Sequence, residues 1–147
     1  MTVYENLAFP LRHHKKEMGK EKMDELIREV LENVGLPDAG HQMPSELSGG
    51  MSKRIGLART LILKPEIMLY DEPTTGLDTV TAREISQLML DMQRKYKISS
   101  MIITHDIPCA KMTGDRIVIL KDGTIVAEGS YEELEKNDDE WVRSFFS

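Results

Sequence analysis

The pattern that most restricts the fold is a pair of short apolar runs separated by one amphipathic helix. Ile67–Tyr70 is the first run, and Ser99–Thr104 is the second. Between them, residues 79–96 place apolar side chains at helical spacing. A strand, a crossover helix and a second strand form a βαβ unit, in which the two strands run parallel. The sequence therefore predicts an α/β fold in which both strands are buried.

Helices are expected on the N-terminal side of this unit. Residues 23–34 repeat apolar positions at helical spacing until Gly35 stops the pattern. A further helix is expected over residues 49–63, opening at a pair of glycines. Residues 1–12 also have helical spacing, which Pro10 interrupts.

On the C-terminal side, the sequence predicts a β-hairpin and a short helix. The runs Arg116–Leu120 and Thr124–Glu128 flank an Asp-Gly pair, which is a strong hairpin pattern. Ser130 and Glu133 have the spacing of a capping box, so a helix is expected to begin there.

Composition excludes several classes of protein. The formal net charge of −6 offers no electrostatic footprint for nucleic acid, and Cys109, the only cysteine, rules out an intrachain disulfide. No apolar run reaches the length of about 18 residues that a membrane span needs. Residues 1–5 lack the basic and apolar regions of a signal peptide. We expect a cytoplasmic protein that neither binds nucleic acid nor inserts directly into a membrane.

A glycine-rich turn opens the helix expected after residue 49. The chain reads Ser48-Gly49-Gly50-Met51 at this point. Glycines let a backbone approach a ligand closely, and a helix N-terminus adds free N–H groups and a positive dipole end. Together these features suit a phosphate. The alternative is an ordinary serine N-cap after a glycine turn.

Two carboxylates, Asp71 and Glu72, follow the first apolar run directly. Ligands bind at the carboxyl ends of the strands in open α/β sheets. One carboxylate there can hold Mg²⁺ through water, and its neighbour can orient or deprotonate an attacking water. The alternative is a surface acidic pair after a core strand.

His105 follows the second apolar run, so it is expected at the same edge of the sheet. At that edge a histidine can contact a phosphate oxygen or the attacking water, whereas the alternative is a capping or solvent-exposed histidine. Asp78 ends the polar turn that begins at Thr74, and on its own it is expected to be the N-cap of the helix at 79.

The order and spacing of these features resemble the ATP-binding-cassette (ABC) ATPase family. Leu47–Asp78 reads LSGGMSKRIGLARTLILKPEIMLYDEPTTGLD, and the resemblance extends from Thr2 to about Glu135. It implies a P-loop NTPase-like α/β core, here a partial parallel sheet with flanking helices and a C-terminal hairpin. Residues 1–64 are expected to form a helical signature subdomain, and residues 65–147 part of a RecA-like core.

The resemblance also implies roles in ATP hydrolysis, with ATP and Mg²⁺ as the expected cofactors. Asp71 looks like the Walker B aspartate that holds Mg²⁺ through water. Glu72 looks like the general base, and His105 looks like the switch histidine.

Two further segments resemble parts of the family that act across a dimer. Ser48, Gly49 and Gly50 look like the signature loop, which in this family contacts the γ-phosphate bound to the partner subunit. Asp78 lies in what resembles the D-loop, which communicates between subunits. The resemblance therefore implies a head-to-tail dimer with a second ATPase subunit, docked on membrane permease subunits.

Two features depart from the family pattern. Met51 replaces the usual signature glutamine, so Ser48 cannot complete an S-x-x-Q capping box, at a cost of about 0.5–2 kcal/mol. No G-x-x-x-x-G-K-[ST] Walker A loop occurs in the 147 residues. The family places this loop upstream, on a strand between those resembling Ser99–Thr104 and Arg116–Leu120. We therefore expect an unfilled position between these strands, and residues that alone neither bind ATP tightly nor hydrolyse it.

The opening TVYENLAFPLR and the LSGGM signature most resemble the Mce or toluene-tolerance type of bacterial transporter, which is linked to phospholipid movement between membranes. Such a subunit is peripheral to the inner membrane, held there by its permease subunits. One alternative is a non-catalytic remnant or a split-gene half that needs a separate Walker A piece. Another is a DNA-maintenance ABC ATPase, which the single short helix at residues 18–34 disfavours.

Overall fold

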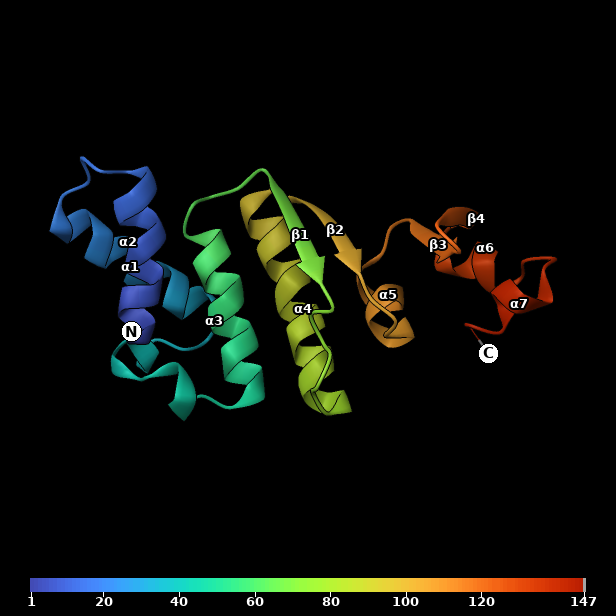
Figure 1. The fold of residues 1–147 in the computed structure, drawn as a ribbon, viewed down its shortest axis with the longest axis horizontal. Coiled ribbons are helices and arrows are strands. Elements are labelled where there is room, and N and C mark those ends of the chain that lie inside the picture. The colour runs from blue at the N-terminus through green and yellow to red at the C-terminus, as the bar shows by residue number, and fades with distance from the viewer. Residues whose placement is uncertain (147) are drawn as a thin grey trace.

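The computed structural model describes residues 1–146, and its elements follow one another in a row from the N-terminal helices to the C-terminal hairpin (Figure 1). The helices are α1 (Val3–His14), α2 (Lys20–Asn33), the 3-10 turns η1 (Ala39–His41) and η2 (Pro44–Glu46), α3 (Gly49–Leu61), α4 (Thr79–Tyr96), α5 (Ile107–Thr113), α6 (Tyr131–Glu135) and α7 (Glu140–Arg143). The strands are β1 (Ile67–Asp71), β2 (Ser99–Ile103), β3 (Ile117–Lys121) and β4 (Thr124–Gly129).

Helices α1, α2 and α3 pack around one apolar core. Val3, Leu7, Leu11 and Leu61 are all buried within it. Helix α1 continues through Pro10, so the interruption expected there was wrong. Packing of its apolar face stabilises α1. The helix therefore tolerates the loss of the backbone hydrogen bond that proline, which has no N–H, cannot make.

The predicted βαβ unit is present. Strands β1 and β2 pair in parallel, and α4 crosses between them over the residues expected from the sequence. On one face of this sheet Met68 is buried with Leu88 and Met92 of α4. The α4 layer therefore joins the sheet to the same core that holds α1–α3.

The opposite face of the β1–β2 sheet is exposed, so the prediction of two buried strands was only half right. Four large apolar side chains on this face lie 62–74% exposed: Ile67, Leu69, Met101 and Ile103. Leu69 and Met101 are direct cross-strand partners. An apolar run is typical of a strand covered on both faces, but within residues 1–146 only the Met68 face is covered.

The C-terminal region forms the predicted hairpin of β3 and β4, and α6 begins at the expected capping box of Ser130 and Glu133. Among residues 1–146, β2 pairs only with β1, and β3 pairs only with β4.

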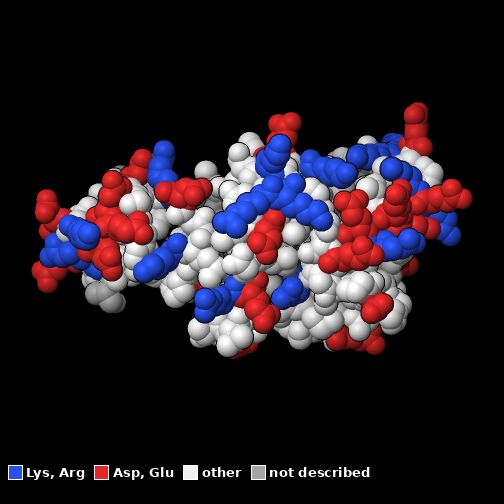
Figure 2. Space-filling model, turned by 180° about the vertical axis from the view of Figure 1, so that it is seen from behind, with Lys and Arg blue, Asp and Glu red and all other residues white. Residues whose placement is uncertain are grey.

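Charged side chains of both signs are intermingled on the face shown in Figure 2, which therefore presents no broad basic surface. In the part of the chain that the structure describes, every helix is too short or too polar to cross a bilayer.

Candidate functional site

Candidate catalytic residues lie together where β1 and β2 end. Figure 1 shows both strands pointing toward the lower side of the molecule, where α3 and α4 begin. Glu72 follows β1, and its carboxylate Oε1 lies 2.9 Å from Nδ1 of His105, two residues beyond β2. The carboxylate and the imidazole thus share one edge of the sheet, as parallel pairing requires.

Several contacts hold the Glu72 side chain and backbone. Its Oε2 accepts a hydrogen bond from the Thr75 hydroxyl at 3.0 Å. Its N–H donates to the Ile103 carbonyl at 2.9 Å, which extends the β1–β2 ladder by one bond. Its φ of 47° lies in the left-handed region, which costs a non-glycine residue about 1–3 kcal/mol. Surrounding bonds must therefore keep Glu72 in this conformation.

The contact between Glu72 and His105 shifts the pKa values of the two side chains in opposite directions. The hydrogen bond from His105 lowers the pKa of Glu72, and the Thr75 hydroxyl adds to this effect. The same contact with Glu72 raises the pKa of His105, with a smaller contribution from Asp106. The contact is fully formed as an ion pair at pH values above the ordinary pKa of a carboxyl and below the ordinary pKa of an imidazole. It weakens as the pH rises through the raised pKa of His105.

A second link ties the loop after β1 to the loop after β2. The Thr74 hydroxyl, which is buried, donates to Oδ2 of Asp106 at 2.7 Å. The other oxygen of Asp106 accepts the Cys109 N–H and caps α5. Because Asp106 adjoins His105, this link places the imidazole beside Glu72. Sequence reasoning missed both residues, although Asp106 two residues before Pro108 is a recognisable N-cap pattern.

Asp71 is the last residue of β1 and is exposed. Its side chain extends on the same face as Leu69, and no described residue bonds or pairs with its carboxylate. Residues 1–146 contain no group of three or more histidine, cysteine or acidic side chains placed to hold a metal. A free single carboxylate fits a hydrated Mg²⁺, because Mg²⁺ keeps several waters and binds through one or two carboxylates plus phosphates.

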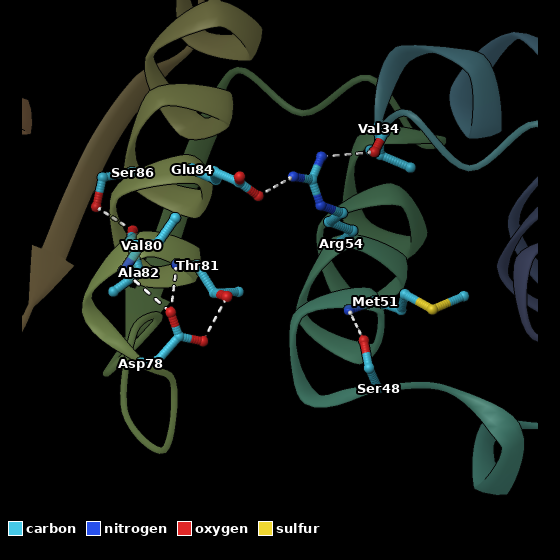
Figure 3. Close-up of polar contacts among 10 residues, drawn as sticks. All are labelled: Val34, Ser48, Met51, Arg54, Asp78, Val80, Thr81, Ala82, Glu84 and Ser86. Carbon is cyan, nitrogen blue, oxygen red and sulfur yellow. Dashed lines mark hydrogen bonds and ion pairs between the residues drawn. The ribbon is translucent and has the colours of Figure 1, made fainter.

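Ser48 is the N-cap of α3, and its hydroxyl accepts the Met51 N–H at 3.2 Å. Met51 returns no side-chain bond to Ser48, as expected from the missing glutamine. Asp78 caps α4 by accepting the N–H groups of Val80 and Thr81 at 3.0 Å and the Thr81 hydroxyl at 2.6 Å (Figure 3). The hydrogen bond from that hydroxyl lowers the pKa of Asp78.

The glycines of the turn allow α3 to lie against the start of α4. A Cβ added to Gly50 would lie 2.7 Å from Cγ2 of Thr81, and one added to Gly49 would lie 3.3 Å from Cδ2 of Leu77. The Thr81 methyl has little freedom to move away, because the hydroxyl on the same carbon is bound to Asp78. The turn and the Asp78 cap are therefore packed as one unit.

We expect Gly50→Ala to lower the free energy of unfolding by about 1–3 kcal/mol, because the added methyl overpacks this contact. Thr81→Ser removes the obstructing methyl and keeps the hydroxyl bound to Asp78, so the double variant recovers most of the loss. Urea unfolding of the two single variants and the double variant measures both effects. If Gly50→Ala lowers the free energy of unfolding equally in the original chain and in the Thr81→Ser variant, the clash is excluded as the cause.

Solved structures of similar shape define the class of this fold. One is cbiO1 from Clostridium perfringens, part of the ABC transporter complex cbiONQ, with a TM-score of 0.80 and 28% identity over 88% of this chain and 51% of that chain. Another is the ATP-binding cassette MJ0796, solved as a dimer with ADP and Pi, with a TM-score of 0.76 and 33% identity over 88% and 56%. The fold is that of an ABC ATPase cassette.

The family model described as ABC transporter matches residues 1–75. The chain therefore belongs to the ABC transporter family, as part of an ATP-binding domain. "Probable ribonucleotide transport ATP-binding protein mkl" of Mycobacterium leprae is 40% identical over all of this chain and 42% of its own length. "Intermembrane phospholipid transport system ATP-binding protein MlaF" of Escherichia coli K12 is 37% identical over 99% of this chain and 54% of its own length. The chain spans about half the length of such relatives.

Proposed function

We propose that this chain is the signature and Walker B part of the ATP-hydrolysing subunit of a bacterial transporter that moves phospholipid. The observation that carries the ATPase proposal is the 2.9 Å contact between Glu72 and His105 at the carboxyl ends of two parallel strands. The name of the E. coli relative supports phospholipid as the cargo. The name of the mycobacterial relative makes a ribonucleotide the second candidate.

In this proposal Glu72 accepts the proton of the attacking water, and His105 orients Glu72 and contacts the γ-phosphate. Asp71 holds the metal through water, and Mg²⁺ when bound neutralises charge on the phosphates. The ion-paired state of Glu72 keeps it deprotonated and able to act as a base. Asp71 and His105 are exposed and Glu72 is half-buried, and all three lie at or just after the ends of β1 and β2.

Ser48, Gly49 and Gly50 are proposed to contact the γ-phosphate held by a second ATPase subunit in a head-to-tail dimer, and Asp78 to shape the contact between subunits. The dimeric MJ0796 cassette, which matches this chain at 33% identity, supports such an assembly. We further propose that permease subunits hold the dimer at the cytoplasmic face of the inner membrane. The proposed division is a signature subdomain at residues 1–64 and a core part at residues 65–147.

The exposed sheet face suggests what completes the site. Ile67, Leu69, Met101 and Ile103 form an apolar surface beside the free edge of β2. Relatives of about twice the length contain additional sequence that can cover such a surface. We propose that a segment carrying a Walker A loop packs here, so that these 147 residues alone are inactive and act as one part of a cassette.

Co-expression of the chain with a Walker A-bearing segment from a cassette of the same family tests this proposal. We call the resulting complex the assembled cassette, and we expect it to hydrolyse ATP in the presence of Mg²⁺. A stable complex that shows no Mg²⁺-dependent hydrolysis would favour the non-catalytic alternative. Stimulation of the assembled cassette with its permease by phospholipid, rather than by ribonucleotide, distinguishes the two candidate cargoes.

A further inference from the structure

Helix α3 carries two neighbouring cations that reach in different directions. Arg54 donates to the Val34 carbonyl and to Oε2 of Glu84, both at 3.1 Å, and so fastens α3 to the end of α2 and to α4 (Figure 3). Lys53, one residue earlier and half-buried, donates from Nζ to the backbone carbonyl of Glu72 at 3.2 Å. The helix that begins at the signature turn therefore touches the backbone of the proposed base.

The position of the Glu72 carbonyl affects the direction in which the Glu72 carboxylate points. It accepts the Lys53 ammonium and also the Thr75 N–H at 3.3 Å. The peptide that carries it follows a residue held at a φ of 47°. Because this conformation is unfavourable without supporting contacts, removal of the ammonium relaxes the backbone that aims the Glu72 carboxylate.

We propose that Lys53 is a positioning residue that holds the Glu72 backbone and couples it to the signature turn at the start of α3. This inference rests on the function proposed above. There, Ser48–Gly50 contact the nucleotide held by the second subunit, whereas Glu72 acts on the nucleotide of its own subunit. Lys53 then links the two nucleotide sites through one short helix. A shift of α3 caused by the nucleotide of the second subunit moves Glu72, the general base of this subunit.

Contacts other than those of Lys53 keep α3 in place. Arg54 anchors the same helix to α2 and α4, and the apolar face of α3 is buried in the main core through Ile55, Ala58 and Leu61. Removal of the Lys53 ammonium should therefore leave the helix folded and free only the carbonyl.

The test compares three variants of the assembled cassette. Lys53→Met removes the donor but keeps the apolar stem, and we expect kcat to fall about tenfold with KM for ATP unchanged, because misplacement of a reacting group slows chemistry rather than binding. Lys53→Arg restores a donor and recovers kcat. Arg59→Met is the matched control, since Arg59 is an exposed cation on α3 whose side chain makes no polar contact with residues 1–146.

A second readout does not depend on turnover. Amide hydrogen exchange at Thr75, whose N–H donates to the Glu72 carbonyl, is measured in the 147-residue chain without nucleotide. Lys53→Met should accelerate this exchange severalfold, and Arg59→Met should not. If Lys53→Met does not fold, Lys53→Leu, which is apolar and also has no donor, takes its place in both measurements.

The two readouts separate the inference from the proposed function. An assembled cassette without ATPase activity contradicts the proposed function, while exchange at Thr75 still decides whether Lys53 holds this backbone. Unchanged exchange in the Lys53 variant overturns the inference, as does a fall in kcat that Lys53→Arg fails to reverse. Faster exchange with a lower kcat, both reversed by Lys53→Arg, supports it.

Discussion

Glu72→Gln is expected to lower kcat of the assembled cassette by about 10²- to 10⁴-fold, the usual contribution of a general base. Glutamine keeps one of the two oxygens, which contact His105 and Thr75 respectively, but cannot accept the proton of an attacking water. The bonds that hold the backbone of residue 72 remain, since Lys53 and Ile103 contact main-chain atoms. Affinity for ATP should therefore change little, and steady-state kinetics with ATP measures kcat and KM separately.

The control for this variant is Glu66→Gln, which removes one negative charge from an exposed site just before β1, at its opposite end. Its kcat should equal that of the unchanged protein, because it lies far along the strand from His105. A Glu72→Gln cassette that retains full turnover would show that another group activates water, and the role proposed for Glu72 would have to be abandoned.

The sequence predicted where Glu72 and His105 lie because parallel strands bring their carboxyl ends to one edge of a sheet. It did not predict the contacts that hold them there. Lys53 reaches Glu72 across 19 positions, and Thr74 reaches Asp106 across 32. Such contacts depend on how helices and loops pack in three dimensions. No local periodicity or cap pattern encodes them.

The helices and the hairpin were also predictable, because their caps, turns and apolar spacing are local. The exposure of Leu69 and Met101 was not predictable, because an apolar strand indicates that its faces suit a core but does not indicate what covers them. Pro10 was misjudged for a related reason. Tertiary packing of α1, through residues such as Leu7 and Leu11, outweighed a local helix breaker.

The 147 residues alone should show no ATP binding at millimolar nucleotide. A Walker A loop gives the β- and γ-phosphates several backbone N–H bonds and a lysine, and gives Mg²⁺ a hydroxyl. Each hydrogen bond to a charged group is worth about 1.5–3 kcal/mol, so the absence of four or five removes on the order of 6–15 kcal/mol of interaction. Since about 1.4 kcal/mol is a tenfold change in affinity, a micromolar Kd becomes weaker than roughly 10 mM.

Isothermal titration calorimetry with Mg²⁺ and ATP measures this loss, and the assembled cassette provides the positive reference. The comparison is informative because Glu72 and His105 are already in contact in the chain alone, and Asp71 lies exposed at the end of the same strand, β1. If these groups bind ATP without a Walker A loop, a saturable signal appears in the micromolar range. That signal, or turnover that Glu72→Gln abolishes, would mean that the chain holds phosphates by contacts of its own, and the need for a second segment would disappear.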